Sequence, residues 1–456
     1  MSTYLRTFAV ALTLATIGRG AQAQTAAATE FWSALGDTTL IRLVNETRLA
    51  NPDVRIAAAR AAGARAERTG AALDLLPVVT TRTGYSRQRI ASASFPGASG
   101  VLPDQNVWDA GLALSWEVDV SGRLRNSLRA RSAIADAAAE DARDVEVALT
   151  AEVASAYLAL RGAEERLAVA RNNAENQRRT LELTQRRLEA GRGTQLDSER
   201  AKAQLSATLA AIPTLETVIE TARQRIRVIT GHARTETFGL PECDTPECDT
   251  APELPALPEL GPVDQVVHER PDVRSAERQL AASRSSVAAA RADYLPRLAL
   301  GGAAGYTGSE ARALGAAGTP RYVVGPVLSW PAFDLGHVRA YVAAARADEA
   351  QSRARYELAL SRAQEELETS IVAYRNSRRR LEYLAAAAAA SARAAELARL
   401  RYTEGGSDFL QVLDAERTLL ERENERAAGR TEAETNLVAV YRALGGANAF
   451  ATSARR

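Results

Sequence analysis

Two different periods of hydrophobic and polar positions alternate along the chain. From Val107 to Asp119, apolar residues alternate with small or acidic ones, which is the period of two expected for a strand with unlike faces. Arg321 to Trp330 repeats this alternation, and Val78 to Arg87 and Leu298 to Tyr306 show weaker versions of it. The pattern predicts four strands arranged as two hairpins.

A long stretch with helical spacing follows each predicted hairpin. Leu124 to Glu189 and Val338 to Thr403 are nearly free of Gly and Pro, and each would span roughly 100 Å as an α-helix. Apolar residues form one stripe on the first stretch: Val145, Leu149, Val153, Tyr157 and Leu160. This arrangement predicts amphipathic coiled-coil helices.

Glycine turns end both long stretches, at Gly191-Arg192-Gly193 and at Gly405-Gly406. Helical spacing then resumes toward Thr230 and Leu444, so each half of the chain is predicted to contain a helical hairpin.

A shorter helix is expected before each β-hairpin, from Val54 to Leu76 and from Val273 to Leu295. Pro52 and Pro271 suit the first turns of these helices, where a missing N–H costs nothing.

Short motifs recur at one offset, which indicates a duplicated half-protein. Pro52-Asp53-Val54-Arg55 returns as Pro271-Asp272-Val273-Arg274, and Leu76-Pro77 returns as Leu295-Pro296; 271 − 52 = 219 and 296 − 77 = 219. This period is far longer than the roughly 20 to 50 residues of solenoid repeats. The expected organisation is a signal peptide at 1–23, an N-terminal equatorial segment at 24–51, repeat 1 at 52–232, a Pro-rich linker at 233–262, repeat 2 at 263–446 and a C-terminal tail at 447–456.

The N-terminus has the features of a secretory signal. Arg6 supplies the charge, Phe8 to Ile17 a short apolar run, and Ala21-Gln22-Ala23 a cleavage site, so cleavage is expected before Gln24. The residue directly after that site is not a cysteine, and a lipid anchor is therefore not expected. No later stretch reaches the roughly 20 apolar residues of a spanning helix.

Composition and motifs exclude several functional classes. A net charge of +1 gives no indication of nucleic-acid binding. His232, His268 and His337 are scattered, no Gly-rich phosphate loop is present, and no set of nucleophile, base and oxyanion donors emerges. We therefore expect neither an enzyme nor a cofactor or metal site.

The predicted strands have one apolar face and one small or polar face, as in a transmembrane β-barrel. A β-sandwich with one buried face would show the same alternation. Aromatic residues near the strand ends favour the barrel, because they match interfacial girdles: Tyr85, Trp108, Trp116, Tyr306, Tyr322 and Trp330. Four strands cannot close a barrel, and an open sheet in lipid would leave unpaired backbone groups, so oligomerisation is expected.

Between about Glu30 and Gly446, the chain resembles TolC-like outer-membrane factors, and most closely their efflux-pump branch. The motifs that support the resemblance are the paired Pro-Asp-Val-Arg segments, Ala292 to Arg297, Asp119 to Arg123, Asp334 to Gly336, Arg401 to Gly405 and Leu413 to Ala415.

The resemblance implies an α+β membrane protein. It would be a homotrimer whose protomers contribute four strands each to one outer-membrane β-barrel, continued by a long α-helical barrel in the periplasm. The implied function is the exit duct of a tripartite efflux system with a periplasmic adaptor protein and an inner-membrane pump of the RND type. The alternatives are the duct of a type I protein secretion system and an exported structural coiled-coil protein, although the latter leaves the strands unexplained.

The resemblance also assigns roles to the tips of the helical hairpins. Asp414 matches an acidic ring at the closed aperture, and Asp197 and Tyr402 match a pair that links neighbouring helices. Gln411 stands where a second acidic ring would be, and Ser407 replaces a locking arginine. The candidate aperture residues are Asp197, Tyr402, Asp408, Gln411 and Asp414. An alternative for Asp408 and Asp414 is that both are acidic residues favoured at a helix N-terminus.

The expected adaptor contacts are small or apolar residues of the same tips: Gly191, Gly193, Leu196, Gly405 and Leu410. The glycines have the alternative role of ending helices. Cys243 and Cys248 lie in tandem pentapeptides of the linker, and export favours a local disulfide between them. A metal site there would need more ligands than the motif provides.

Overall fold

The computed structural model describes residues 31–32, 37–89, 91, 103–232, 254–255, 257 and 262–446. The expected signal peptide, the disulfide candidates Cys243 and Cys248, and the C-terminal tail lie outside these residues. The chain divides into two compact units: unit 1 holds Met1–Ala58, Glu140–Arg274 and Ala359–Arg456, and unit 2 holds Ala59–Ala139 and Ser275–Leu358.

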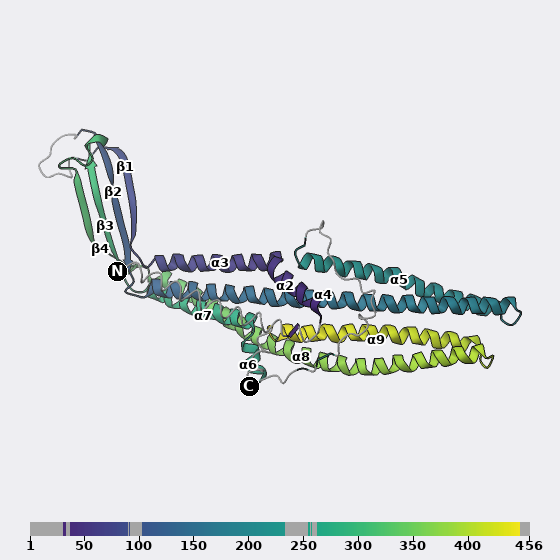
Figure 1. The fold of residues 1–456 in the computed structure, drawn as a ribbon. Helices are drawn as coiled ribbons and strands as arrows, with labels where there is room; N and C mark the ends of the chain where they lie inside the picture. The colour runs from purple at the N-terminus through teal and green to yellow at the C-terminus, as the bar shows by residue number, and fades with distance from the viewer. Residues whose placement is uncertain are drawn as a thin grey trace, which may run out of the picture. The chain divides into compact units, whose positions relative to one another are not determined.

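Unit 2 contains one antiparallel sheet of four strands in the order β1-β2-β3-β4 (Figure 1). The strands are β1 (Val78–Gln88), β2 (Gln105–Val118), β3 (Arg297–Gly308) and β4 (Pro320–Ser329). The four predicted strands are confirmed, with ends that differ by a few residues. Among the described strands, β1 and β4 each pair on one side only, so the sheet has two open edges.

The strand register gives the sheet two unlike faces, because residues paired directly across antiparallel strands lie on the same face. We call one the polar face; its residues are mostly small or polar and include Arg82, Asp109, Gly111, Ala113, Ala303, Gly305, Thr307 and Arg321. We call the other the aromatic face; it includes Tyr85, Trp108, Leu112, Trp116, Tyr306, Tyr322 and Leu328.

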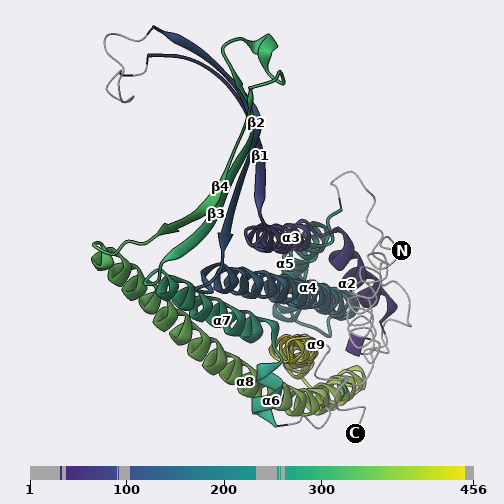
Figure 2. The ribbon, with the colours of Figure 1, turned by 90° about the vertical axis from the view of Figure 1, so that its left-hand side faces the viewer.

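β2 and β3 curve along their length (Figure 2), and two glycines allow them to approach closely. Gly111 pairs with Gly305, and a Cβ added to Gly111 would lie 2.5 Å from the Ala304 carbonyl oxygen. A Cβ added to Gly305 would collide with the backbone of Ala110. Any side chain at either position would therefore push the two strands apart.

The helices before the β-hairpins are α3 (Pro52–Leu73) and α7 (Pro271–Ala292). Each begins at its proline, two residues before the predicted start, and ends three residues before the predicted Leu76 or Leu295. The helices end early because a proline follows each of these leucines, and the residue before proline disfavours the α conformation.

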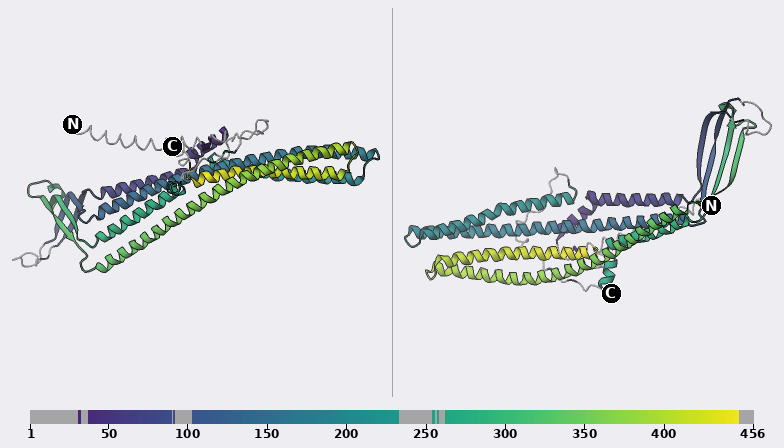
Figure 3. Two further views of the ribbon diagram at one scale, coloured as in Figure 1. Left: turned by 90° about the horizontal axis from the view of Figure 1, so that it is seen from below. Right: turned by 180° about the vertical axis from the view of Figure 1, so that it is seen from behind.

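The long helices are α4 (Arg123–Glu189) and α8 (Leu335–Thr403), and both contribute to the two units. In unit 1, α5 (Gln195–Ile229) runs back along α4, and α9 (Phe409–Ala443) runs back along α8 (Figure 3). The predicted helical hairpins are thus confirmed. The predicted stripe is buried at Val153, Tyr157 and Leu160 and half-buried at Val145 and Leu149.

Shorter elements complete the described fold: α2 (Thr38–Ala50), α6 (Val263–His268) and the 3-10 turn η3 (Ala311–Ala313). The sequence patterns did not predict them. Trp32, Leu40 and Leu43 are fully buried in unit 1, where Trp32 packs edge-on against Phe31 with ring centroids 4.8 Å apart. None of the described helices is both long enough and apolar enough to cross a membrane.

The duplication is visible as two equivalent joints in unit 1. Asn51 donates its amide N–H to the carbonyl of Ile229 at the end of α5, at 2.6 Å. Its counterpart Arg270 donates to the carbonyl of Ala443 at the end of α9, at 2.8 Å. Each joint thus fixes the start of a pre-hairpin helix to the end of a returning helix. Glycines with positive φ follow both returning helices, Gly231 at 73° and Gly445 at 71°.

Candidate functional site

The two hairpin tips have the same backbone geometry. Gly191 and Gly405 have φ of 68° and 81°, in the left-handed region that favours glycine. At each tip the N–H after the glycine donates across the turn at 2.8 Å, from Arg192 to Arg187 and from Gly406 to Arg401. These are Schellman motifs, so the glycines do end the helices. Their role in contacting an adaptor protein stays a prediction.

The helices that leave the two tips begin differently. At α5, the N-cap Thr194 accepts the N–H of Asp197 at 3.2 Å, and its hydroxyl donates to the Asp197 carboxylate at 2.7 Å. At α9, the N-cap is Asp408, whose side chain makes no capping hydrogen bond. The carboxylate of Asp197 is therefore held on its own helix, whereas that of Asp408 is exposed.

Arg187 joins the end of α4 to the end of α8. Its guanidinium donates to the Tyr402 carbonyl at 2.8 Å and to the Thr403 carbonyl at 3.3 Å. Its central carbon also lies 4.1 Å from the centroid of the Tyr402 ring. A cation is favourable there because the last carbonyls of a helix are negative and the ring face attracts positive charge.

Tyr402 is buried beneath this arginine. It is 7% exposed, and its ring lies 5.5 Å from that of Phe409 on the next helix. Together with Ala201 and Val412, these two rings form a hydrophobic cluster under the tip. No hydrogen bond joins Asp197 to Tyr402 within the described protomer, so their pairing across neighbouring helices stays a prediction. The contact of Arg187 with Tyr402 was not predicted from the sequence.

The predicted aperture residues Gln411 and Asp414 lie on the exposed side of α9. Gln411 and Asp414 are exposed, whereas Phe409 and Val412 on the other side of the helix are buried. The side chain of Asp414 is 67% exposed and forms an ion pair with Arg417 at 3.0 Å. This pair was not predicted, although the spacing of three residues indicates it. A neighbouring guanidinium reduces the cation attraction expected of Asp414.

The two expected apolar contact residues are also accessible. Leu196 is 58% exposed on α5, and Leu410 is 49% exposed on α9. Exposed leucines beside tight glycine turns can form a surface for close helix packing. The tips thus offer apolar and acidic side chains to a partner.

Behind the tips, α4 and α9 meet along buried and half-buried polar side chains, which we call the polar seam. Arg166 donates to Asn424 at 2.7 Å, and Asn173 donates to Glu423 at 2.8 Å. Glu416, whose side chain is 3% exposed, accepts from Thr180 at 3.0 Å and from Arg399 of α8 at 2.8 Å. Directional bonds of this kind fix the register of packed helices, because a slip would leave buried groups unpaired.

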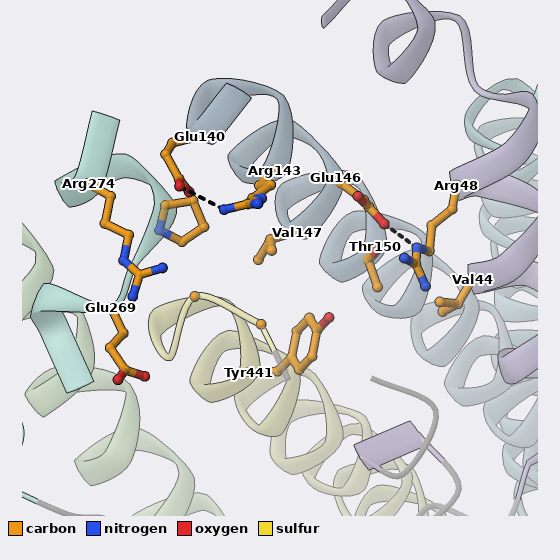
Figure 4. Close-up of a pocket in the computed structure, with 13 residues that line it drawn as sticks. Val44, Arg48, Glu140, Arg143, Glu146, Val147, Thr150, Glu269, Arg274 and Tyr441 are labelled. Atoms are coloured by element: carbon orange, nitrogen blue, oxygen red, sulfur yellow. Dashed lines mark hydrogen bonds and ion pairs between the residues drawn. The ribbon is translucent and has the colours of Figure 1, made fainter. Parts of the chain in front are cut away.

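A small cavity lies in unit 1 near the two joints (Figure 4). Its volume of about 60 Å³ is well below the several hundred Å³ of ligand pockets. Two ion pairs line it, Arg48 with Glu146 and Arg143 with Glu140. Burial raises the pKa of Tyr441, which lines the cavity from α9, to about 12. The cavity is a packing defect among charged side chains, with no room for a substrate.

Across the residues that the structure describes, no three His, Cys, Asp or Glu side chains are close enough together to hold a metal ion.

Comparisons with known proteins identify the family. A family model described as outer membrane efflux protein matches residues 43–232 and 263–446. The outer membrane protein OprJ of Pseudomonas aeruginosa is 30% identical over 444 residues, which covers 94% of this chain and 89% of that protein. The toluene efflux pump outer membrane protein TtgF of Pseudomonas putida is 30% identical over 381 residues, or 82% and 76% of the two chains.

Solved structures agree with this assignment. The outer-membrane channel OprN matches with a TM-score of 0.84 and 38% identity, over 91% of this chain and 92% of that one. The open-state MtrE channel of Neisseria gonorrhoeae matches with a TM-score of 0.79 and 26% identity, over 90% and 89%. The resemblance, the fold class and the outer-membrane location are confirmed, and a structural coiled-coil protein is excluded. The chain belongs to the outer membrane efflux protein family.

Proposed function

We propose that three copies of this chain form the outer-membrane exit duct of a tripartite efflux system. The observation that supports this most directly is the sheet: it has an aromatic face, a polar face and two open edges. Lipid cannot satisfy the unpaired N–H and C=O groups of an open edge, so strands in a membrane must close into a barrel. With β1 of one copy beside β4 of the next, three copies would supply 3 × 4 = 12 strands.

The aromatic face has aromatic rings near both of its ends, as a lipid-facing band does. Tyr85 and Trp108 stack at one end, with ring centroids 4.7 Å apart. At the other end, the indole N–H groups of Trp116 and Trp330 donate to the carbonyls of Leu75 and Tyr294 at 3.0 and 3.1 Å. Trp108 and Trp116 are 116 − 108 = 8 residues apart on β2, or about 26 Å along the strand, which becomes about 20 Å of height at the roughly 40° tilt of barrel strands. The apolar band of outer-membrane barrels is about 25 Å tall.

The helical hairpins would extend from the barrel into the periplasm and end at the glycine tips. We infer that these tips close the duct and bind a periplasmic adaptor protein, through Leu196 and Leu410 and the glycines beside them. The aperture would be lined by Gln411 and Asp414, both exposed in the protomer. The duct would be passive, and the inner-membrane pump, of the RND type, would select the substrate.

The names of relatives support efflux over protein secretion. TtgF is named as part of a toluene efflux pump, and OpmQ of Pseudomonas aeruginosa as a pyoverdine export protein. The two names give different substrates, which is consistent with selection by a partner and not by the duct.

The test is the molar mass of the protein extracted in detergent from outer membranes, with the detergent contribution subtracted by light scattering. We expect three times the mass of the mature chain. A monomer that is soluble without detergent would contradict the proposal, because neither edge strand would then have a partner.

A further inference from the structure

One row of paired residues crosses the whole sheet and places an arginine on each edge strand. Arg82 on β1 pairs with Gly111 on β2, Gly111 pairs with Gly305 on β3, and Gly305 pairs with Arg321 on β4. We call this row the arginine rung. All four residues lie on the polar face, because directly paired residues share a face.

The charge of Arg321 is already neutralised. Its Nε donates to the Asp109 carboxylate at 2.8 Å and to the Thr307 hydroxyl at 2.8 Å, and its Nη2 forms an ion pair with Asp109. Thr307 also donates to Asp109, at 2.8 Å. This network holds Arg321 across three strands in a fixed position.

The charge of Arg82 is not neutralised in the same way. Within the ranges that the structure describes, its guanidinium forms no side-chain hydrogen bond or ion pair, and the residue is exposed. The other charged strand residues of this face are paired elsewhere, Glu117 with Arg123 and Arg297 with Asp293. Each protomer therefore has an excess of one positive charge at the rung, from Arg82, Arg321 and Asp109.

The middle of the rung carries no side chains. Gly111 and Gly305 have no side chains, and the neighbouring pair on the same face is Ala113 and Ala303. The guanidinium of Arg82 thus lies beside residues with small side chains or none and is accessible to a ligand. Planar guanidinium groups bind phosphate, sulfate and carboxylate groups through two parallel hydrogen bonds.

We propose that the arginine rung is an anion-binding site in the outer part of the duct, which attracts molecules with phosphate, sulfate or carboxylate groups. The proposal rests on the closed trimeric duct, in which the polar face lines the lumen. Three copies would then place an excess of 3 × (2 − 1) = 3 positive charges at one level. A ring of one sign in a channel of low-dielectric walls concentrates counter-ions.

The experiment is a current recording on purified trimers in planar bilayers, with inorganic triphosphate added to the side of the β-hairpin loops. The expected result for the wild type is a current that falls as triphosphate rises, with no comparable block by hexaamminecobalt at the same concentrations. In Arg82→Gln, the half-blocking concentration should rise on the order of tenfold, because each rung loses its unpaired guanidinium. Arg82→Lys should keep most of the block, because it keeps the charge.

Arg87→Gln is the matched control. Arg87 lies on the same strand but on the opposite face, and it forms an ion pair with Asp104 at 3.1 Å. The control removes the same charge and should leave the block unchanged.

Two outcomes would overturn the inference while leaving the duct intact: wild-type channels that triphosphate does not block, or equal block in the wild type and Arg82→Gln. Absence of any trimer or channel current from the wild type would instead contradict the proposed function. If Arg82→Gln does not assemble, the comparison of triphosphate with hexaamminecobalt on the wild type still decides the matter.

Discussion

Replacing Arg187 by alanine should loosen the tip of the second helical hairpin. The guanidinium makes two charged hydrogen bonds to the carbonyls of Tyr402 and Thr403 and lies over the Tyr402 ring. A hydrogen bond to a charged group is worth about 1.5 to 3 kcal/mol, and an exposed cation–π contact about 0.5 to 1 kcal/mol. The 3.3 Å bond is long and Arg187 is only half-buried, so we expect a net loss of about 2 kcal/mol.

A loss of this size would increase local opening of the tip about 30-fold. Amide hydrogen exchange measures such opening directly, and the reporting N–H groups are those of Gly405 and Gly406, which donate to Tyr402 and Arg401. Exchange at the first tip, around Gly191, should change less. Arg187→Lys should give an intermediate exchange rate, since it keeps the charge but loses the planar guanidinium that makes both hydrogen bonds.

Arg186→Ala is the control for Arg187→Ala. Arg186 is the preceding residue of α4 and is exposed, so its loss removes the same charge without the two hydrogen bonds. Equal exchange at Gly405 in both variants and the wild type would refute the reasoning, because it would mean that Arg187 does not hold the end of α8.

Three further predictions concern the stability of the protomer. Gly445→Ala should lower the free energy of unfolding by at least 1 kcal/mol, because the φ of Gly445 is 71° and an added Cβ would meet backbone and ring atoms within about 3 Å. Gly63→Ala, at a helical position with open space, should be neutral or stabilising, and denaturant titrations measure both variants. Arg270→Met should cost about 1 to 3 kcal/mol, because the buried carbonyl of Ala443 would lose its donor, while Asp272 and Glu366, with side chains 34% and 40% exposed, would be hydrated; Arg278→Met, exposed on α7, should cost little. Burial raises the pKa of Glu434, so the folded state binds the proton of this carboxyl more tightly than the unfolded chain does, and the free energy of unfolding should fall as pH rises from about 4 through the raised pKa. Thermal unfolding at several pH values measures this curve. Glu434→Gln should flatten it in that range, and an unchanged curve would reject the assignment.

The elements were predictable because their signals are local. The alternation in Val107 to Asp119 and the glycines at Gly191 and Gly405 depend on neighbouring residues only, and the structure places strands and turns there. The predicted ends of α3 and α7, at Leu76 and Leu295, lie beyond the observed ends. Apolar spacing continues up to the proline that follows each of these leucines, whereas the backbone turns before it.

The contacts of the site were harder to predict because they join distant parts of the chain. Arg187 lies 215 residues from Tyr402, and no periodicity relates them. The two arginines of the rung become neighbours of one row only through the register of β2 on β3, which the alternation alone does not specify. By contrast, the pair of Asp414 with Arg417 needed only the helical spacing.

The two joints of the duplicated fold differ in their chemistry, and this makes the two halves of a protomer respond differently to the medium. Asn51 is a neutral amide, so its bond to Ile229 is little affected by salt or pH. Arg270 combines its carbonyl bond with ion pairs to Asp272 and Glu366, whose side chains are 34% and 40% exposed, so dissolved salt screens these pairs. As the salt concentration rises, the helical hairpin of the second half should therefore loosen at its base before that of the first, which gives the duplicated halves separate thresholds.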